Sequence, residues 1–516
     1  MRAGTTRFIA GVGMLAVALG TAWLLAAQDR SAQGGRAGRG ESAAPAEARG
    51  RGRGLAPEPP LWLSDDEYLR WPLPASEQKY AALDGFRIKR HINDITAFSR
   101  KSRDDGNQYW GRITGTQYDK MTTDYVASEF RRIGLEQVRI QDFDLPPQWF
   151  PTSWDVTLTG AARTATLKSA FPLFNSIGAP SADLEPVWVG TGTAADFLGR
   201  AVRGKAAVVY GFPNPGGRND TALTNGAVAL ADRAGAAALF IVLGIPGNVM
   251  NEPQAGGTEA PAKIPVFMLG NDDGIAIREM IERQQSPKLK VRLQVESRTG
   301  LKTASVWGML PGMTDENVIV MAHTEAFFEG AMDNASGVGT MIELAEYYSK
   351  IPKAERKRTM VFFTSSAHHA PSGEEAGIRW IHNHRQDMFQ KTALIVNCEH
   401  TSQVQTYLIG NNLVGSNTIS ARRWYVGGSD ALKKIVATTF KNFGIAIYSR
   451  PEARPGGELG NVYMDAPSVH VIDHTIYHTD LDVPLLVPEP GLEAVARAFA
   501  KIIDEVNKLA LSNLRI

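Results

Sequence analysis

The chain has 516 residues, of which 43% are hydrophobic and 21% are charged, and its formal net charge is +1. This length leaves room for two or three folded domains, and the balanced charge gives no sign of a nucleic acid or another strongly charged partner. The single cysteine, Cys398, excludes an intrachain disulfide. A metal site would therefore use mainly histidines and carboxylates, and nine of the ten histidines lie at or after residue 323.

The N-terminal segment predicts export. Residues 1–27 carry Arg2 and Arg7 ahead of an apolar run, which is the pattern of a signal peptide or membrane anchor. Arginines just beyond the run disfavour translocation of that side, but export remains the preferred interpretation. Residues 28–60 are rich in Gly, Arg and Pro and predict a disordered linker. We expect a periplasmic, extracellular or anchored protein that meets the membrane only through this segment.

The first folded part, residues 61–152, begins an α/β pattern. Residues 86–98 and 118–133 have the apolar spacing of helices, and residues 138–143 have the character of a strand.

Residues 153–300 have a different pattern, with short apolar runs between Gly- and Pro-rich loops and one Ala-rich helical stretch at 223–234. Three pieces occur in order: Gly-Lys-Ala-Ala-Val-Val at 204–209, Ala-Asp-Arg-Ala-Gly-Ala-Ala-Ala at 231–238 and Ile-Pro-Val-Phe at 264–267. Their order and spacing resemble the protease-associated domain, a β-rich module inserted in several peptidases. The resemblance implies a lid or a docking surface rather than catalysis.

The last part, residues 301–516, returns to strands that alternate with helices. This pattern predicts an α/β fold, a three-layer sandwich with a mostly parallel central sheet. The expected strands are 305–310, 317–322, 359–364 and 393–398, and the expected helices are 338–349, 375–384 and 492–509.

His323 and Asp333 are the first candidates for a metal site. His323 ends the predicted strand at 317–322, and Asp333 precedes the predicted helix at 338–349. Both should emerge at the same edge of the sheet, where open α/β folds place their sites. Taken singly, each has an ordinary explanation as a polar loop residue or a helix N-cap. The metal interpretation therefore depends on further ligands at that edge.

Later segments offer such ligands after other predicted strands. Imidazole and carboxylate are ligands that zinc takes, and a carboxylate can bridge two ions roughly 3.5–4 Å apart. A two-metal centre is therefore expected. The candidates are His368 and His369 after 359–364, Glu399 after 393–398, and His474 and His478 within 473–480.

The run Asp-Asn-Ala-Ser-Gly at 333–337, which follows a strand-end histidine, resembles the co-catalytic zinc exopeptidase family. This family includes secreted aminopeptidases, glutamate carboxypeptidase and glutaminyl cyclases. The resemblance covers about 85–150 and 300–510. It implies a cofactor of two zinc ions, or of one, and a peptide or small peptide-like substrate. It is compatible with a homodimer.

The resemblance also implies roles for particular residues. His323 and Glu399 would bind one zinc, His478 the other, and Asp333 would bridge them. Glu325 stands where the family has an aspartate that orients the ligand histidine through a hydrogen bond.

One position departs from the family, which carries a Glu-Glu pair whose first member is the general base and whose second member binds zinc. Ungapped alignment places His368-His369 there, whereas the pair Glu374-Glu375 lies six residues later and requires an insertion. The ungapped alignment is preferred, with His369 as ligand and His368 as base. As a base, His368 would become positively charged and be repelled by two dications. At ~5 Å and an effective dielectric of ~20, each pair of unit charges repels by roughly 3 kcal/mol.

These residues predict a zinc-dependent exopeptidase. The alternatives are a catalytically impaired binding or receptor module, and a single-zinc acyl-transfer enzyme. Nucleophilic hydrolysis is disfavoured because the peptidase-like part has no Gly-x-Ser-x-Gly motif. The choice between aminopeptidase and carboxypeptidase stays open, because arginines that could hold a carboxylate serve equally well as surface residues. These arginines are Arg422, Arg423, Arg450 and Arg454.

Overall fold

A computed structural model describes residues 70–516 except 162–163, 214–219, 254–261, 373–375, 410–411, 448–465 and 473–475. These residues belong to one compact unit, Pro57–Ile516. Among the described helices, none combines the length and apolarity needed to cross a membrane. The predicted N-terminal segment and linker lie outside the described residues, as do Glu374, Glu375, Arg450, Arg454 and His474.

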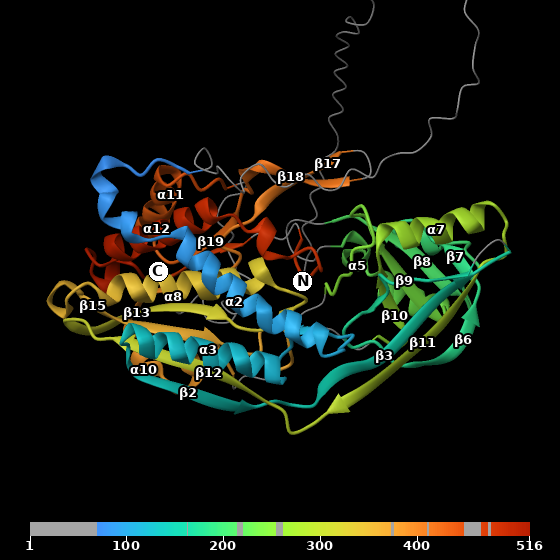
Figure 1. The fold of residues 1–516 in the computed structure, drawn as a ribbon, viewed down its shortest axis with the longest axis horizontal. Coiled ribbons are helices and arrows are strands. Elements are labelled where there is room, and N and C mark those ends of the chain that lie inside the picture. The colour runs from blue at the N-terminus through green and yellow to red at the C-terminus, as the bar shows by residue number, and fades with distance from the viewer. Residues whose placement is uncertain are drawn as a thin grey trace, which may run out of the picture. The chain divides into compact units, whose positions relative to one another are not determined.

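A seven-stranded sheet in the order β19-β20-β16-β13-β15-β12-β2 forms the centre of the fold (Figure 1). Its four middle strands, from β20 to β15, are parallel, and the three outer pairings are antiparallel. The predicted α/β sheet with a parallel core is confirmed. The strands are β2 (Glu136–Asp144), β12 (Lys302–Leu310), β13 (Thr314–His323), β15 (Arg358–Ser365), β16 (Thr392–Asn397), β19 (Arg423–Gly427) and β20 (Ser468–Ile472).

Helices cover both faces of this sheet and complete three layers. Along β13, Val318 and Val320 pack against the larger helix layer, whereas Ile319 and Met321 pack against the smaller one. This alternation follows from the two-residue repeat of a strand. The larger layer holds α2 (Gly85–Asp104), α3 (Gln117–Ile133), α8 (Gly337–Ser349), α11 (Asp430–Asn442) and α12 (Glu489–Val506), and the smaller holds α9 (Ile378–His384) and α10 (Gln386–Phe389).

Local signals set the ends of the predicted helices. The Asp84 side chain accepts a hydrogen bond from the amide of Phe86 and so caps the start of α2. Gly134, with a φ of 85°, ends α3 in a left-handed conformation that glycine adopts readily.

Two further sheets lie between β2 and β12 in the chain. One is antiparallel, in the order β4-β3-β11-β6, and the other, β5-β10-β9-β8-β7, is parallel apart from β5. This β-rich insert begins with β3 at Gln148, ahead of the expected boundary at 153. Its strands are β3 (Gln148–Thr159), β4 (Thr164–Thr166), β5 (Phe171–Pro172), β6 (Ala179–Leu184), β7 (Pro186–Trp188), β8 (Ala206–Gly211), β9 (Ala238–Leu243), β10 (Val266–Leu269) and β11 (Lys288–Arg298).

The helices of the insert differ from the expectation. The stretch at 223–234 is divided into α5 (Thr221–Thr224) and α6 (Ala227–Ala234), because Gly226 has a φ of 74°. The insert also contains α4 (Ala194–Phe197) and an unpredicted α7 (Asn271–Glu282). Its assignment to the protease-associated domain stays a prediction.

Two short pairings complete the described structure. The hairpin of β17 (Val404–Ile409) and β18 (Asn412–Ile419) follows β16, and β1 (Gly111–Arg112) pairs with β14 (Ala326–Phe327).

The β1–β14 pair brings the buried Arg112 beneath the loop that joins β13 to α8. Its guanidinium donates hydrogen bonds to the main-chain oxygens of Thr324, Glu329 and Gly330 at 2.7–3.0 Å. It also donates to Ser99 Oγ on α2 at 2.7 Å. One side chain therefore satisfies three main-chain carbonyls of a loop that the sequence had marked as part of the site.

Replacement of Arg112 by methionine should lower the free energy of unfolding by roughly 1–3 kcal/mol, because the buried main-chain oxygen of Thr324 loses its donor. The main-chain oxygens of Glu329 and Gly330 keep hydrogen bonds from Ser99 Oγ and from the Ala335 amide. Urea unfolding followed by circular dichroism would measure this loss. The matched control is Arg283→Met, at a side chain that is 67% exposed, where a change within about 0.5 kcal/mol is expected. Equal effects of the two variants would contradict this account of Arg112.

Candidate metal centre

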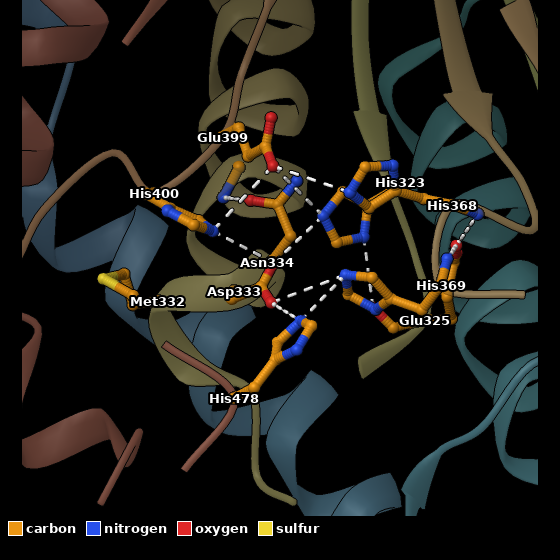
Figure 2. Close-up of polar contacts among 12 residues, drawn as sticks. His323, Glu325, Met332, Asp333, Asn334, His368, His369, Glu399, His400 and His478 are labelled. Atoms are coloured by element: carbon orange, nitrogen blue, oxygen red, sulfur yellow. Dashed lines mark hydrogen bonds and ion pairs between the residues drawn. The ribbon is translucent and has the colours of Figure 1, made fainter. Parts of the chain in front are cut away.

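The candidate ligands gather at the carboxyl ends of the parallel strands (Figure 2). His323 is the last residue of β13, whereas Asp333 lies in the turn Ala331–Ser336, just before α8. The other candidates follow β15, β16 and β20 in the chain. The structure thus brings together five buried side chains that the sequence singled out: His323, Asp333, His369, Glu399 and His478.

Asp333 stands in the middle of this cluster, with its two oxygens facing different histidines (Figure 2). Asp333 Oδ1 lies 3.0 Å from His323 Nε2, which is also 3.8 Å from Glu399 Oε1. Asp333 Oδ2 lies 2.9 Å from His478 Nε2 and 3.6 Å from His369 Nε2. We call these groups the His323 half-site and the His478 half-site.

The donor atoms fit a metal ion of zinc's size and preference. Both oxygens of Asp333 are buried, and among the described residues neither accepts a hydrogen bond, although imidazole nitrogens surround them. Tetrahedral zinc with bonds of about 2.0–2.2 Å holds neighbouring ligand atoms about 3.3–3.5 Å apart. The separations within the two half-sites, 2.9–3.8 Å, span this range.

The charge states also suit a cation. Burial alone would raise the pKa of Asp333, but the imidazoles around it, led by His369, hold that pKa well below its usual range. Glu399 behaves in the same way, with its pKa lowered mainly by His470. Burial lowers the pKa values of His369 and His478. Carboxylates that stay charged and imidazoles that stay neutral are the forms that bind metal.

Main-chain oxygens orient two of the imidazoles. His323 Nδ1 lies 3.1 Å from the main-chain oxygen of Glu325, and His478 Nδ1 lies 2.7 Å from that of Glu252. A hydrogen bond at Nδ1 fixes the ring so that Nε2 faces the metal. Because Glu252 lies between β9 and β10, the insert supports the His478 half-site directly.

Glu325 acts differently from the expectation. We expected its carboxylate to orient His323, but the atom that meets His323 Nδ1 is the main-chain oxygen. The carboxylate instead accepts hydrogen bonds from the amides of His368 and His369, and from that of Thr324 at 3.2 Å. Glu325 therefore shapes the loop after β15 that carries the histidine pair.

The two members of that pair occupy different places. His369 lies inside the His478 half-site, whereas His368 lies at the rim, with 13% of its side chain exposed. The His368 ring stacks on His323 with centroids 4.5 Å apart, and its Nε2 is 3.9 Å from Glu399 Oε1. His368 is thus beside both candidate ligands of the His323 half-site.

Two further buried histidines, His400 and His470, belong to the cluster, although the sequence argument assigned them no role. His400 Nε2 lies 3.1 Å from Asp333 Oδ1, and His470 Nε2 lies 2.6 Å from Glu399 Oε2. His400 could have been suspected because it directly follows Glu399. His470 could not, because the strand that carries it, β20, was not predicted.

The remaining candidates lie elsewhere. Cys398 is buried, which raises the pKa of its thiol and makes it a poor nucleophile. Its main-chain oxygen accepts a hydrogen bond from Asn334 Nδ2 at 3.0 Å. Arg422 is buried and donates to the main-chain oxygen of Thr401, so it is not a surface residue.

A narrow pocket opens beside His369 and Glu325. Five aromatic side chains contribute to its lining, which suits an apolar group. The aromatic side chains are those of Tyr109, Trp149, Phe150, Phe174 and Phe327.

Comparison with known proteins finds similar chains among the aminopeptidases. Aminopeptidase YwaD of Bacillus subtilis is 27% identical to this chain over 260 residues, which are 49% of this chain and 50% of that protein. The chain therefore spans about half the length of this curated relative.

Solved structures share the fold. A zinc aminopeptidase from Bacillus subtilis superposes with a TM-score of 0.58 and 18% identity, over 86% of this chain and 99% of that one. A peptidase M28 precursor from Shewanella amazonensis gives a TM-score of 0.65 and 16% identity, over 86% and 96% of the two chains. Residues 305–503, which include every candidate ligand, match the sequence profile of peptidase family M28. The part of the chain that carries the candidate metal centre is therefore similar to peptidase family M28.

Proposed function

We propose that this protein is a zinc-dependent exopeptidase of the aminopeptidase type. The observation that carries the proposal is the position of Asp333, whose two buried oxygens each face imidazoles of a different half-site. A bridging carboxylate between two such donor sets is suited to a pair of metal ions. The family match and the zinc aminopeptidases among the similar structures support the same chemistry.

In this proposal each half-site holds one zinc ion. His323, Glu399 and Asp333 Oδ1 would hold the first, and His369, His478 and Asp333 Oδ2 would hold the second. Zinc, when bound, acts as a Lewis acid and makes water acidic enough to attack a peptide carbonyl. The proton of that water must reach the leaving amine, and His368 at the rim is the proposed carrier.

The pocket beside His369 suggests the kind of substrate. Its aromatic lining provides apolar contact at the half-site where the scissile bond would lie. We propose that it receives an apolar side chain of the substrate's terminal residue. Export of the enzyme is also proposed, supported by the apolar run at residues 8–27 and by the precursor among the similar structures.

The histidine pair itself favours a second candidate function, a module that binds zinc and peptide but cleaves slowly. His368 stands where a carboxylate base is expected, and a protonated imidazole near two dications is repelled by both. Activity measurements on the unmodified chain against peptides and aminoacyl amides separate this candidate from the enzyme.

Metal removal tests the proposed cofactor. Dialysis against a chelator should abolish hydrolysis and lower the thermal unfolding midpoint, because a ligand at 1,000 times its Kd stabilises the native state by about 4 kcal/mol. Elemental analysis should find two zinc ions per chain, and zinc should restore both properties. Magnesium serves as the control, since an imidazole-rich site binds it poorly. Absence of bound zinc in the purified protein would overturn the proposal.

Substitution of His368 tests its role as base. His368→Gln should lower kcat by roughly 10²-fold or more, because it removes proton transfer. His368→Glu should raise kcat above that of the parent. This variant should also bind the second zinc more tightly, since a carboxylate is attracted to the metals. Steady-state kinetics and zinc titration measure both, with His384→Gln on the exposed part of α9 as control. Parent-like kinetics in both His368 variants would remove His368 from the mechanism.

The aromatic pocket predicts side-chain selectivity. Among aminoacyl p-nitroanilides, leucyl and phenylalanyl substrates should exceed aspartyl and lysyl ones in kcat/KM by at least about 10-fold, since apolar pocket contacts discriminate by about 1–3 kcal/mol. Trp149→Ala should reduce this preference. The control is Trp71→Ala, because Trp71 is 54% exposed and is not among the residues that line the pocket. Preference for charged residues would contradict the assignment of the pocket.

A further inference from the structure

We propose that His400 is a fourth protein ligand of the His323 half-site, which makes that half-site closed and leaves the open coordination position at the His478 half-site. This inference rests on the proposed zinc-dependent function and adds a metal ligand, His400, to it. It also assigns different tasks to the two metal positions.

The first argument is that His400 and His323 approach the same two carboxylates at matching distances. His323 Nε2 lies 3.0 Å from Asp333 Oδ1 and 3.8 Å from Glu399 Oε1. His400 Nε2 lies 3.1 Å and 3.9 Å from the same two oxygens. The four distances scatter around the separation of about 3.3–3.5 Å between neighbouring ligands of tetrahedral zinc. An ion beside Asp333 Oδ1 and Glu399 Oε1 would therefore be within reach of either imidazole.

The second argument comes from the contrast with His470. His470 Nε2 is 2.6 Å from Glu399 Oε2, the oxygen that also accepts a hydrogen bond from Asn397 Nδ2 at 3.1 Å. Glu399 Oε2 therefore faces His470 and Asn397, which lie outside the half-site, and Oε1 faces the half-site. His470 is an orienting partner of Glu399, whereas His400 lies on the inner side, near Oε1 and Asp333 (Figure 2).

The third argument is that the chain holds His400 firmly in this place. His400 has a φ of 46°, and its two neighbours are tied to the turn that carries Asp333. The main-chain oxygen of Cys398 accepts from Asn334 Nδ2, and the amide of Thr401 donates to Ser336 Oγ, both at 3.0 Å. The spacing between His400 and Asp333 is therefore set by hydrogen bonds on both sides of His400.

The closure of one half-site has a chemical consequence. Zinc sites with four protein ligands are structural, whereas catalytic sites have three and keep one position for water or substrate. The His478 half-site offers three donors: His369, His478 and Asp333 Oδ2. It also lies beside the aromatic pocket, which His369 helps to line. The open position and the proposed substrate pocket therefore coincide.

The test counts imidazoles on zinc by X-ray absorption at the zinc edge. The full chain carrying His478→Gln, loaded with one equivalent of zinc, isolates the His323 half-site. We expect two imidazoles on this zinc. His478→Gln/His400→Gln should show one and should bind zinc at least about 10-fold more weakly, by chelator competition. The matched control, His478→Gln/His470→Gln, should retain two imidazoles, because His470 meets only the outer oxygen of Glu399.

One imidazole in the His478→Gln parent, or an unchanged count after His400→Gln, would overturn this inference while the proposed function stands. If the double variant fails to fold, His478→Gln/His368→Gln decides the question, because His368 is the other imidazole near Glu399 Oε1 and two imidazoles that persist without it would support His400. A wild-type chain that binds no zinc would instead overturn the proposed function. Two imidazoles in the parent and one in the double variant would establish His400 as a ligand.

Discussion

The whole centre depends on one buried carboxylate that faces imidazoles on two sides. Asp333 is 2% exposed, and burying an ionised carboxylate without compensation is costly. Here the surrounding imidazoles offset the cost of burying the Asp333 carboxylate, and bound cations would offset it further. The fold supplies that environment because the parallel strands β13, β15, β16 and β20 all end at the edge where the turn before α8 begins. Hydrogen bonds from Arg112 and Asn334 then fix the two loops that face Asp333.

Much of this could be predicted from the sequence, because the signals were local. The apolar run before His323 and the helical spacing after Asp333 place both residues at one sheet edge, whatever the rest of the chain does. The alternation of strands and helices after residue 301 predicts the layers for the same reason. By contrast, β20 and α11 were missed, and Gly226 divided a stretch that had been expected to form one helix.

What the sequence could not supply was contact between distant segments. The main-chain oxygen of Glu252 reaches His478 across 226 positions, and no periodicity reports such a contact. The same holds for Glu325, whose carboxylate turns to the amides of His368 and His369 rather than to His323. Sequence spacing indicates which residues reach an edge of a sheet, but packing decides which atoms face one another there.

The charge around the centre suggests how a site whose described residues offer two candidate ligand carboxylates, Asp333 and Glu399, could hold two dications. Asp333 and Glu399 would supply two negative charges against four positive ones, so buried acidic groups behind the ligands would help to balance the metals. Asp482 accepts hydrogen bonds from the amides of Met332 and Asp333 at 2.6 and 3.0 Å. Burial raises the pKa of Asp482 to about 7. Nearby cations favour the charged form of a carboxyl group, so bound metals would ionise Asp482 and gain a counter-charge.

Asp119 is a second buried carboxyl group near the centre, with its Oδ1 3.4 Å from Thr324 Oγ1. Burial, together with the neighbouring Glu325, raises the pKa of Asp119 to about 7, and its Oδ2 accepts a hydrogen bond from Thr303 Oγ1 at 2.9 Å. These carboxyl groups lie outside the ligand set, so they can release protons to balance the metals without changing the coordination. A histidine at position 369 in place of a carboxylate is therefore compatible with two metals, provided that the charge it lacks is held in this outer layer.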